Sequence, residues 1–239
     1  MSKPAKSYHH GNLRDALIIA AAELIEEHGS LEFSITDAAR RAGVSNAAPY
    51  RHFKDKEDLL DNVRHLAFMG LRQRMQEVRD APGTAPGTVD KVISLGLAYL
   101  QYAREKRAFF SLMWEDRGQM AAVRQDGDSK MDGFYVLVDA VSEFCECQGH
   151  LNHQGALAGR HSGPVTVATQ LWALAHGMAT LEANHMLDLF DRGASSEKLL
   201  TDSTRALLAG LHLDRPRSAA KDKTTVSAAA NDQQQTELF

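Results

Sequence analysis

Residues 34–53, with the sequence SITDAARRAGVSNAAPYRHF, constrain the fold more than any other stretch of this 239-residue chain. In the first half of the stretch alanines recur at helical spacing, and the hydroxyl group of Thr36 can cap the N-terminus of that helix. Gly43 ends the helix, because glycine readily adopts the positive φ with which a chain leaves a helix sharply. The pattern predicts two helices that are joined by a tight turn and pack at a steep angle.

The second helix of this pair is expected over residues 46–53, with Ser45 as its cap. Asn46 and Ala47 are small, so no bulky side chain holds the start of this helix away from the base edges and phosphates of a DNA groove. Pro49 lacks an amide hydrogen, but amides in the first helical turn mostly have no intrahelical partner, so we expect a short, irregular helix. An alanine-rich helix, a glycine and a second helix also occur in other small helical domains.

The same region resembles the DNA-binding domain of TetR-type transcriptional regulators. The resemblance covers about residues 11–71 and rests on the motifs A-A-x-x-L-I-x-x-x-G, A-x-x-A-G-V-S, Y-x-H-F and K-x-x-L-L, in that order along the chain. It implies a three-helix DNA-binding bundle, a fourth helix that leads into a ligand-binding domain, and a dimer on a near-palindromic operator. Asn46 and Pro49 stand where the family commonly has a basic and an aliphatic residue, which leaves the base preference open.

The resemblance, together with the local charge, predicts which residues lie at the DNA. Residues 34–56 hold five basic and two acidic side chains, a surplus of the sign that phosphates require, although the whole chain has a net charge of -4. Lys56 is expected near a phosphate at the start of the fourth helix. The complete predicted set is Thr36, Arg40, Ser45, Asn46, Ala47, Pro49, Tyr50, Arg51, His52 and Lys56.

The rest of the chain is also predicted to be helical, so the fold class is all-α with about nine helices. Apolar residues recur at intervals of three and four, and the Pro/Gly-rich loop APGTAPG interrupts them at 81–87. We expect a DNA-binding domain over 11–71, with its helix-turn-helix motif at 34–53, and an effector-binding and dimerisation domain over 72–213. The helices are expected at 13–29, 36–42, 46–53, 55–79, 89–104, 106–114, 132–147, 164–190 and 197–211, with 120–130 as a candidate for a further short one.

The expected helix over 164–190 carries apolar side chains around most of its circumference. A helix of this kind must be covered on more than one side. Together with the last helix, 197–211, it is expected to form a four-helix interface in a homodimer. The other predicted partners are double-stranded operator DNA and a small-molecule effector. No apolar run is long enough to cross a membrane and no signal peptide is recognised, so we expect a cytoplasmic protein.

A second resemblance lies in the C-terminal half. AYLQYAREKRAFFSLMWEDR followed by QLWALAHGMATLEANHML is similar to the ligand-binding domain of the TetR subgroup marked by Trp, His and Gly, here Trp172, His176 and Gly177. The first two are four residues apart and share a helix face. They either border an effector cavity or fill the core, as aromatic residues at helical spacing commonly do. The predicted cavity residues are Phe109, Phe110, Met113, Trp114, Trp172 and His176.

Cys145, Cys147, His150 and His153 are candidate metal ligands, because zinc and copper prefer thiolates and imidazoles. On a continuous helix the two cysteines point about 200° apart, so buried cysteines and solvated histidines are favoured over a metal site. No metal and no cofactor is predicted. The two cysteines are also too close in sequence to staple the fold.

These patterns together predict a DNA-binding repressor that a small molecule releases from its operator. A transcriptional activator, a structural nucleoid protein and an enzyme built on a helical bundle are the alternatives. Glu115, Asp116, His176 and Glu182 could serve an enzyme, but they lack the spacing of a metal or nucleophile motif. The two ends, 1–10 and 214–239, are expected to form a flexible arm and a disordered tail, since the tail is polar and nearly without aliphatic bulk.

Overall fold

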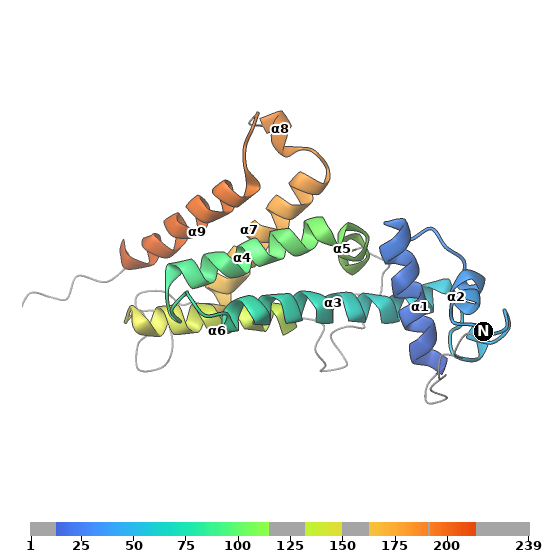
Figure 1. The fold of residues 1–239 in the computed structure, drawn as a ribbon. Coiled ribbons are helices and arrows are strands. Elements are labelled where there is room, and N and C mark those ends of the chain that lie inside the picture. The colour runs from blue at the N-terminus through green and yellow to red at the C-terminus, as the bar shows by residue number, and fades with distance from the viewer. Residues whose placement is uncertain (1–12, 115–131, 150–162, 191, 214–239) are drawn as a thin grey trace, which may run out of the picture.

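The structure, a computed structural model, describes residues 13–114, 132–149, 163–190 and 192–213. These residues form nine α-helices and one short 3₁₀-helix and contain no strand, which confirms the all-α fold class (Figure 1). The candidate helix at 120–130, the arm at 1–10 and the tail at 214–239 lie outside the described residues. The elements are α1 (Leu13–His28), α2 (Ile35–Arg41), η1 (Pro49–Arg51), α3 (Lys56–Asp80), α4 (Val89–Glu105), α5 (Arg107–Trp114), α6 (Asp132–Cys147), α7 (Pro164–Ala183), α8 (Leu187–Phe190) and α9 (Ser196–Leu213).

Helix α3 runs through both halves of the molecule, the N-terminal half with α1, α2 and η1 and the C-terminal half with α4 to α9 (Figure 1). Helix α1 packs against its beginning and α2 packs against α1, while α4, α5 and α6 pack along the remainder. The buried side of α3 extends from Leu59 to Met75. These residues belong to one hydrophobic core that continues from Leu17 in α1 to Leu211 in α9. The predicted domain boundary near residue 72 therefore falls within a helix whose two ends share a single core.

Two hydrogen bonds to backbone carbonyls hold the neighbouring helices on α3. The hydroxyl group of Tyr102 in α4 donates to the carbonyl oxygen of Ala67 at 2.8 Å. Arg64 of α3 is buried and donates from Nε to the carbonyl oxygen of Leu112 in α5, also at 2.8 Å. Both bonds satisfy polar groups that would otherwise be buried without a partner, so they fix the position of α4 and α5 along α3.

Lys91 of α4 caps the C-terminal end of α3. Its side chain is buried, and Nζ donates to three backbone carbonyl oxygens, those of Val78, Arg79 and Ala81, at 3.3, 2.8 and 3.3 Å. The last carbonyls of a helix have no intrahelical donor and carry a partial negative charge, which a cation stabilises. A buried lysine is thus satisfied within the fold.

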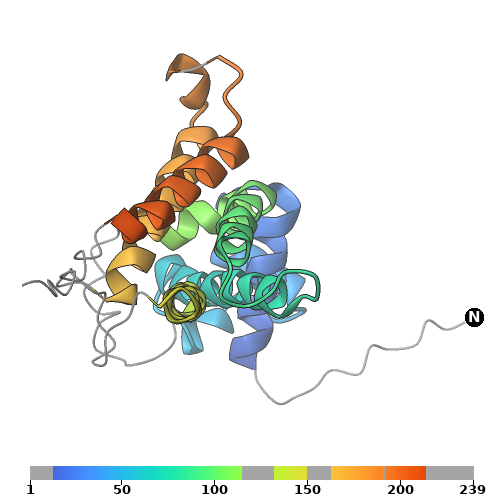
Figure 2. The same ribbon diagram turned by 90° about the vertical axis from the view of Figure 1, so that its left-hand side faces the viewer.

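The helix predicted over 164–190 is interrupted at residues 184–186, which the prediction did not foresee. Helix α7 ends at Ala183, and the chain turns through His185, which adopts a left-handed φ of 54°. The backbone N–H groups of His185 and Met186 donate to the carbonyls of Glu182 and Leu181 at 3.0 and 2.8 Å, the pattern that closes a helix C-terminus. The short helix α8 follows at the outer end of α7 and α9, clear of the other helices in both views (Figures 1 and 2).

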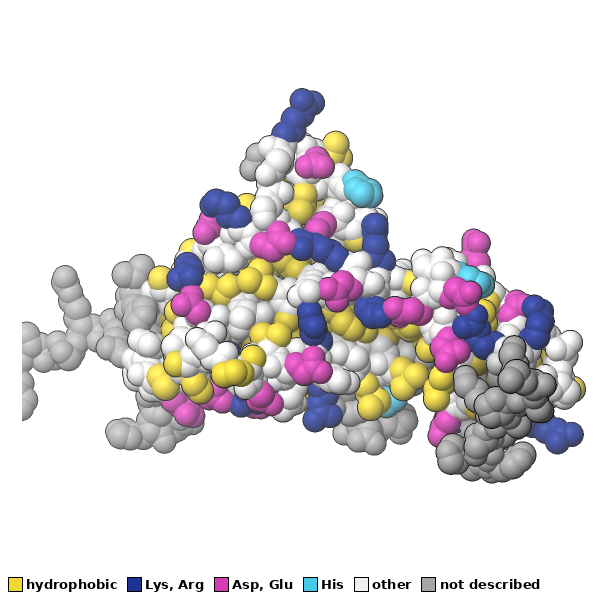
Figure 3. All heavy atoms as spheres, in the orientation of Figure 1, with side chains coloured by type: hydrophobic (Ala, Val, Ile, Leu, Met, Phe, Trp, Pro, Cys, Tyr) yellow, Lys and Arg dark blue, Asp and Glu magenta, His cyan; other side chains and the backbone are white. Residues whose placement is uncertain are grey.

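Helix α8 carries the two most exposed large apolar side chains of the described residues. Leu189 and Phe190 are 76% and 72% exposed. In Figure 3, hydrophobic side chains are visible near this end of the molecule together with charged ones, and both kinds are interspersed over the rest of the face. None of the described helices is both long enough and apolar enough to cross a lipid bilayer.

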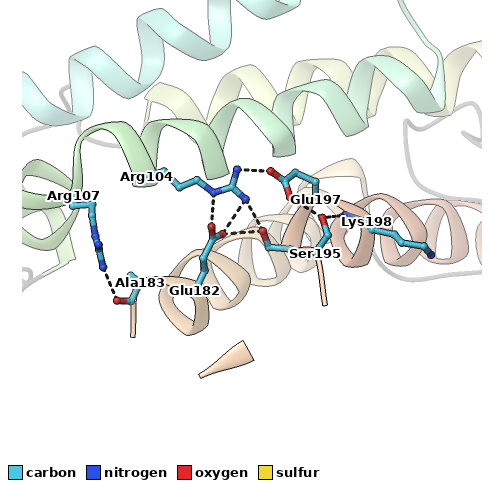
Figure 4. A network of polar contacts seen from close by, with 8 residues as sticks. Arg104, Arg107, Glu182, Ala183, Ser195, Glu197 and Lys198 are labelled. Carbon is cyan, nitrogen blue, oxygen red and sulfur yellow. Dashed lines mark hydrogen bonds and ion pairs between the residues drawn. The ribbon is translucent and has the colours of Figure 1, made fainter. Parts of the chain in front are cut away.

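A polar network around Arg104, near the end of α4, connects the end of α7 with the start of α9, on either side of α8 in the chain (Figure 4). Its guanidinium group pairs with Glu182 of α7 and with Glu197 of α9, and donates to the hydroxyl group of Ser196 at 2.7 Å. These hydrogen bonds raise the pKa of Arg104 and lower the pKa of Glu197 to about 2. The network ties the end of α4 to the segments that enter and leave α8, which is a structural role for Glu182.

The Lys91 cap yields a prediction about stability. Replacement of Lys91 by Met keeps the apolar stem but leaves three carbonyls at the end of α3 without their donor. We expect Lys91→Met to lower the free energy of unfolding by about 2 kcal/mol, measured by urea denaturation. The control is Lys198→Met, which breaks an exposed ion pair with Asp202 and should leave the denaturation midpoint unchanged. Equal midpoints for the two variants would contradict the role of Lys91.

Candidate DNA-reading surface and ligand cavity

Helix α2 begins at a capping box that Ser34 and Asp37 form. Ser34 Oγ accepts a hydrogen bond from the backbone N–H of Asp37 at 3.2 Å, and Asp37 Oδ2 accepts one from the backbone N–H of Ser34 at 2.8 Å. The bonds from Ser34 lower the pKa of Asp37. The predicted cap at Thr36 is wrong, because Thr36 lies inside the first turn and its hydroxyl group bonds to Ser34 Oγ at 2.8 Å. A serine three residues before an acidic residue was the signal for the box.

The glycine turn after α2 is confirmed. Gly43 has a φ of 72°, and its N–H donates to the carbonyl of Arg40 at 3.1 Å. The N–H of Val44 donates to the carbonyl of Ala39 at 3.0 Å, which completes the hydrogen-bond pair typical of a glycine-terminated helix. A side chain at position 43 would strain this turn, so the direction of the following segment depends on glycine.

The segment after the turn contains only the single 3₁₀ turn η1 and not the helix predicted over 46–53. The N–H of Ala48 donates to the carbonyl of Ser45 at 2.9 Å, and the N–H of His52 donates to the carbonyl of Pro49 at 2.9 Å. Pro49 has no N–H to donate to the Ser45 carbonyl, so an α-helical ladder cannot form across this position. Ser45 also provides no side-chain cap for η1, contrary to the prediction.

Most of the predicted DNA-contacting side chains are exposed. Tyr50, a large aromatic residue, is 57% exposed on η1. Pro49 is buried and supports the segment from inside, which corrects its prediction as a contact residue. Thr36 and Lys56 are partly buried. We call the exposed residues of this segment the turn surface, and they are Ser45, Asn46, Ala47, Tyr50, Arg51 and His52.

The basic side chains near the turn surface differ in how they are paired. Arg41 pairs with Glu27 of α1, and Arg40 pairs with Asp37 at 2.7 Å. Arg51 and Lys54 are exposed, and no carboxylate within the described part of the chain pairs with either. Lys54 was not among the predicted contacts, although its charge and its position two residues after His52 are visible in the sequence. The positive charge available to a phosphate is therefore concentrated at the end of the turn surface.

Lys56 is engaged within the domain. Its Nζ donates to the carbonyl oxygen of Leu31 at 2.6 Å and lies 4.7 Å from the ring centroid of Phe33. Lys56 thus fastens the loop between α1 and α2 to the start of α3. A phosphate contact by Lys56 stays a prediction.

Tyr99 of α4 is the centre of a cluster of aromatic rings in the C-terminal half. It is buried, its ring centroid lies 4.9 Å from that of Trp172 and 5.8 Å from that of Phe110, and its hydroxyl oxygen is 3.0 Å from Nδ1 of His176. Burial raises the pKa of Tyr99 and lowers the pKa of His176. Trp172 and His176 both contact Tyr99, so they share a face of α7 as their spacing predicted.

A cavity of about 680 Å³ lies beside this cluster, at the junction of the two halves. The size is within the range of small-molecule sites in proteins. Its lining comes from the loop after α1, from the end of α4, from α5 and from the C-terminal part of α7. The lining residues are Gly29, Ser30, Leu31, Ala103, Arg107, Ala108, Phe110, Ser111, Trp114, His176, Thr180, Ala183 and Asn184.

The structure brings half of the predicted cavity residues to this cavity, namely Phe110, Trp114 and His176. Phe109 and Met113 are buried among core residues and do not line it. Trp172 does not line this cavity either; it borders a void of about 10 Å³, which is too small for a ligand, so its prediction as a cavity residue is also corrected. Sequence reasoning missed Arg107 and the loop at 29–31, because their proximity depends on how α1, α5 and α7 meet.

The candidate metal site receives no support from the described residues. Cys145 is buried, and burial raises the pKa of its thiol to about 11, whereas Cys147 is exposed. His150 and His153 lie outside the described residues, as do Glu115 and Asp116. Among the residues that the structure describes, no three His, Cys, Asp or Glu side chains are grouped in a way that could hold a metal ion.

Two family models match the chain. Residues 17–63 match the one for bacterial regulatory proteins of the tetR family, and residues 92–212 match the one for a tetracyclin repressor-like C-terminal domain. The first match contains α2 and the turn surface, and the second contains Tyr99 and most of the cavity. Both models describe regulatory proteins and not enzymes.

Individual relatives are similar at lower coverage. A fatty acid metabolism regulator protein of Bacillus subtilis is 27% identical over 125 residues, 52% of this chain and 63% of the relative. The HTH-type transcriptional repressor KstR2 of Mycolicibacterium smegmatis is 28% identical over 95 residues, 40% of this chain and 45% of the relative. The chain thus spans less than two thirds of both. A solved protein of unknown function from Rhodococcus sp. RHA1 is 26% identical, with a TM-score of 0.63, over 86% of this chain and 98% of its own.

Burial of His176 makes stability depend on pH. In the folded protein the pKa of His176 lies below its usual value of 6.5. As the pH falls, the unfolded chain therefore takes up a proton at this residue before the folded chain does. The free energy of unfolding should therefore fall as the pH drops below about 6.5, and His176→Gln should reduce that fall between pH 7 and pH 5. NMR titration of the histidine Cε1–H signals, assigned with the same variant, measures the pKa directly. A pKa of His176 at or above 6.5 would contradict the prediction.

Proposed function

We propose that this chain, which belongs to the tetR family of bacterial regulatory proteins, is a sequence-specific DNA-binding transcriptional repressor that a small-molecule effector releases from its operator. The single observation that carries the proposal is the turn surface. A glycine-terminated helix is followed by exposed small, aromatic and basic side chains on a segment whose Pro49 and Phe53 are buried. Small residues allow close approach to base edges, and Arg51 and Lys54 supply charge for phosphates.

The effector is proposed to bind in the 680 Å³ cavity. Both halves of the molecule contribute to the lining, since Gly29, Ser30 and Leu31 follow the first helix of the DNA-binding domain and the other lining residues belong to α4, α5 and α7 or, for Asn184, directly follow α7. Beside the cavity, Lys106 at the end of α4 pairs with Glu26 of α1 across the same junction. A molecule bound there contacts both halves, so it can favour one arrangement of the DNA-binding domain through unequal affinity for the two forms.

Dimerisation through α7 and α9 is part of the proposal. The exposed positions of α7 are uncharged, although exposed helix faces normally carry charges, and they include Thr166, Gln170 and Ala173. A Cβ atom at Gly177 in α7 or at Gly210 in α9 would meet no atom within 4 Å, so packing within one chain requires neither glycine. A small, uncharged face such as that of α7 lets a second copy approach closely, and α7 and α9 from each copy would form a four-helix interface.

Membership of the subgroup marked by Trp, His and Gly is likewise proposed. The support is that Trp172 and His176 join the same ring cluster around Tyr99, while Gly177 lies on the partly exposed side of α7. Transcriptional activation remains the alternative outcome. The position of the DNA footprint relative to the transcription start distinguishes the two, because a repressor site overlaps the promoter.

Two exposed tyrosines allow a matched test of DNA binding. Tyr50 on the turn surface is 57% exposed, and Tyr135 on α6, in the other half of the molecule, is 60% exposed. We expect Tyr50→Ala to weaken binding to the DNA upstream of the protein's own gene at least tenfold, measured by fluorescence anisotropy at fixed salt. Tyr135→Ala should bind as the unmodified protein does. If the unmodified protein binds no fragment of that region at low salt, the proposed function is wrong.

The interface is tested by placing a charge on the uncharged face of α7. Ala173→Glu puts two carboxylates into the proposed interface without a partner, so we expect a monomer by light scattering and weaker binding to a two-site operator. Tyr135→Glu adds the same charge to an exposed position of α6 and should remain a dimer. If Ala173→Glu keeps the dimeric molar mass and the helical content of the unmodified protein, the copies associate through another surface.

A further inference from the structure

The ligand cavity has a single charged side chain in its lining. Of the residues that line it, Arg107 alone carries a formal charge, and no carboxylate is among them. His176 does not add a second positive charge at neutral pH, because burial lowers its pKa. The lining therefore combines apolar and neutral polar groups with one permanent positive charge.

Arg107 is held in place but keeps most of its hydrogen-bonding capacity. It is the first residue of α5, and Nη2 donates to the carbonyl oxygen of Ala183 at the end of α7 at 2.7 Å (Figure 4). A guanidinium group has five N–H donors, and within the described part of the chain no carboxylate pairs with this one. Its neighbours differ, since Arg104 pairs with Glu182 and Glu197, and Lys106 pairs with Glu26.

The polar and the aromatic lining residues of the cavity lie in different places, the polar ones at its rim and the aromatic ones in its interior. Arg107, Ser111, Thr180 and Asn184 are all exposed and mark the rim, whereas Phe110 is buried and faces the interior with two partly buried rings. These two rings belong to Trp114 and His176, whose centroids lie 4.7 Å apart. The ring centroid of Phe110 lies 5.8 Å from that of His176. The interior thus offers aromatic surface, and the rim offers a fixed cation.

We propose that the cavity binds a small organic anion whose carboxylate pairs with Arg107 at the rim and whose flat apolar body packs against Phe110, Trp114 and His176. A carboxylate matches the planar, forked geometry of a guanidinium group and would replace part of its hydration with charge-assisted hydrogen bonds. The body of such a ligand removes aromatic surface from water. The assignment rests on the proposed function only in naming this molecule as the effector.

The test compares carboxylates with their uncharged amides. The probes are 3-phenylpropanoate, 4-phenylbutanoate and 3-(indol-3-yl)propanoate, each with its primary amide, titrated calorimetrically into the full-length protein. The two tryptophans of the chain, Trp114 and Trp172, both belong to the ring cluster, so intrinsic fluorescence provides a second readout. We expect at least one carboxylate to bind about tenfold more tightly than its amide, and Arg107→Gln to abolish that difference. Arg107→Lys should restore part of it.

The control is Arg192→Gln, which removes the same charge from an exposed residue outside the cavity and should keep the preference for the carboxylate. Equal binding of acid and amide, an unchanged preference in Arg107→Gln, or no binding of any carboxylate overturns the inference. These titrations contain no DNA. Failure here leaves the DNA-binding proposal intact, and failure of the anisotropy experiment leaves the ligand assignment to be judged by calorimetry alone.

Discussion

Helix α3 must bury one continuous apolar stripe, and the rest of the molecule is arranged around that requirement. The stripe begins at Leu59, in the part of α3 that packs against α1, and ends at Met75, in the part that packs against α4 and α6. A helix of this length spans about 38 Å and keeps its hydrogen-bond ladder throughout. The two halves are consequently joined by one continuous helix and a shared core.

The contacts beside that helix concentrate at one junction. Arg64 fixes α5 to α3, Tyr102 fixes α4 to α3, and Lys106 pairs with α1. The ligand cavity lies at the same place, with the loop after α1 on one side and α5 and α7 on the other. We expect a ligand that separates or tightens these surfaces to act on residues 29–31, which directly follow α1. The proposed release mechanism therefore needs no long path through the protein, because the cavity already borders both halves.

Local patterns predicted the long elements well and the short ones poorly. The predicted bounds of α1, α3, α4, α5 and α6 differ by a residue or so from those observed, because long amphipathic repeats have one way to bury their apolar face. The cap of α2 was assigned to Thr36 although Ser34 makes the bond, since both carry a hydroxyl group and only the geometry of the first turn decides between them. The end of α7 was not predicted because no proline or glycine follows Ala183 directly; instead His185 adopts the left-handed conformation there.

From the residues alone we could predict the family, the glycine turn after α2 and the aromatic character of the C-terminal half, because each depends on residues that are neighbours along one or two helical turns. The packing of the helices was needed to show that Pro49, Phe109 and Met113 are buried, that Trp172 does not line the 680 Å³ cavity, and that Arg107 stands at its rim without a described carboxylate as partner. Those outcomes depend on which surfaces of α1, α5 and α7 meet. Contacts between segments so far apart in the chain leave no periodic signal in the sequence, since they are fixed by the packing of the whole core.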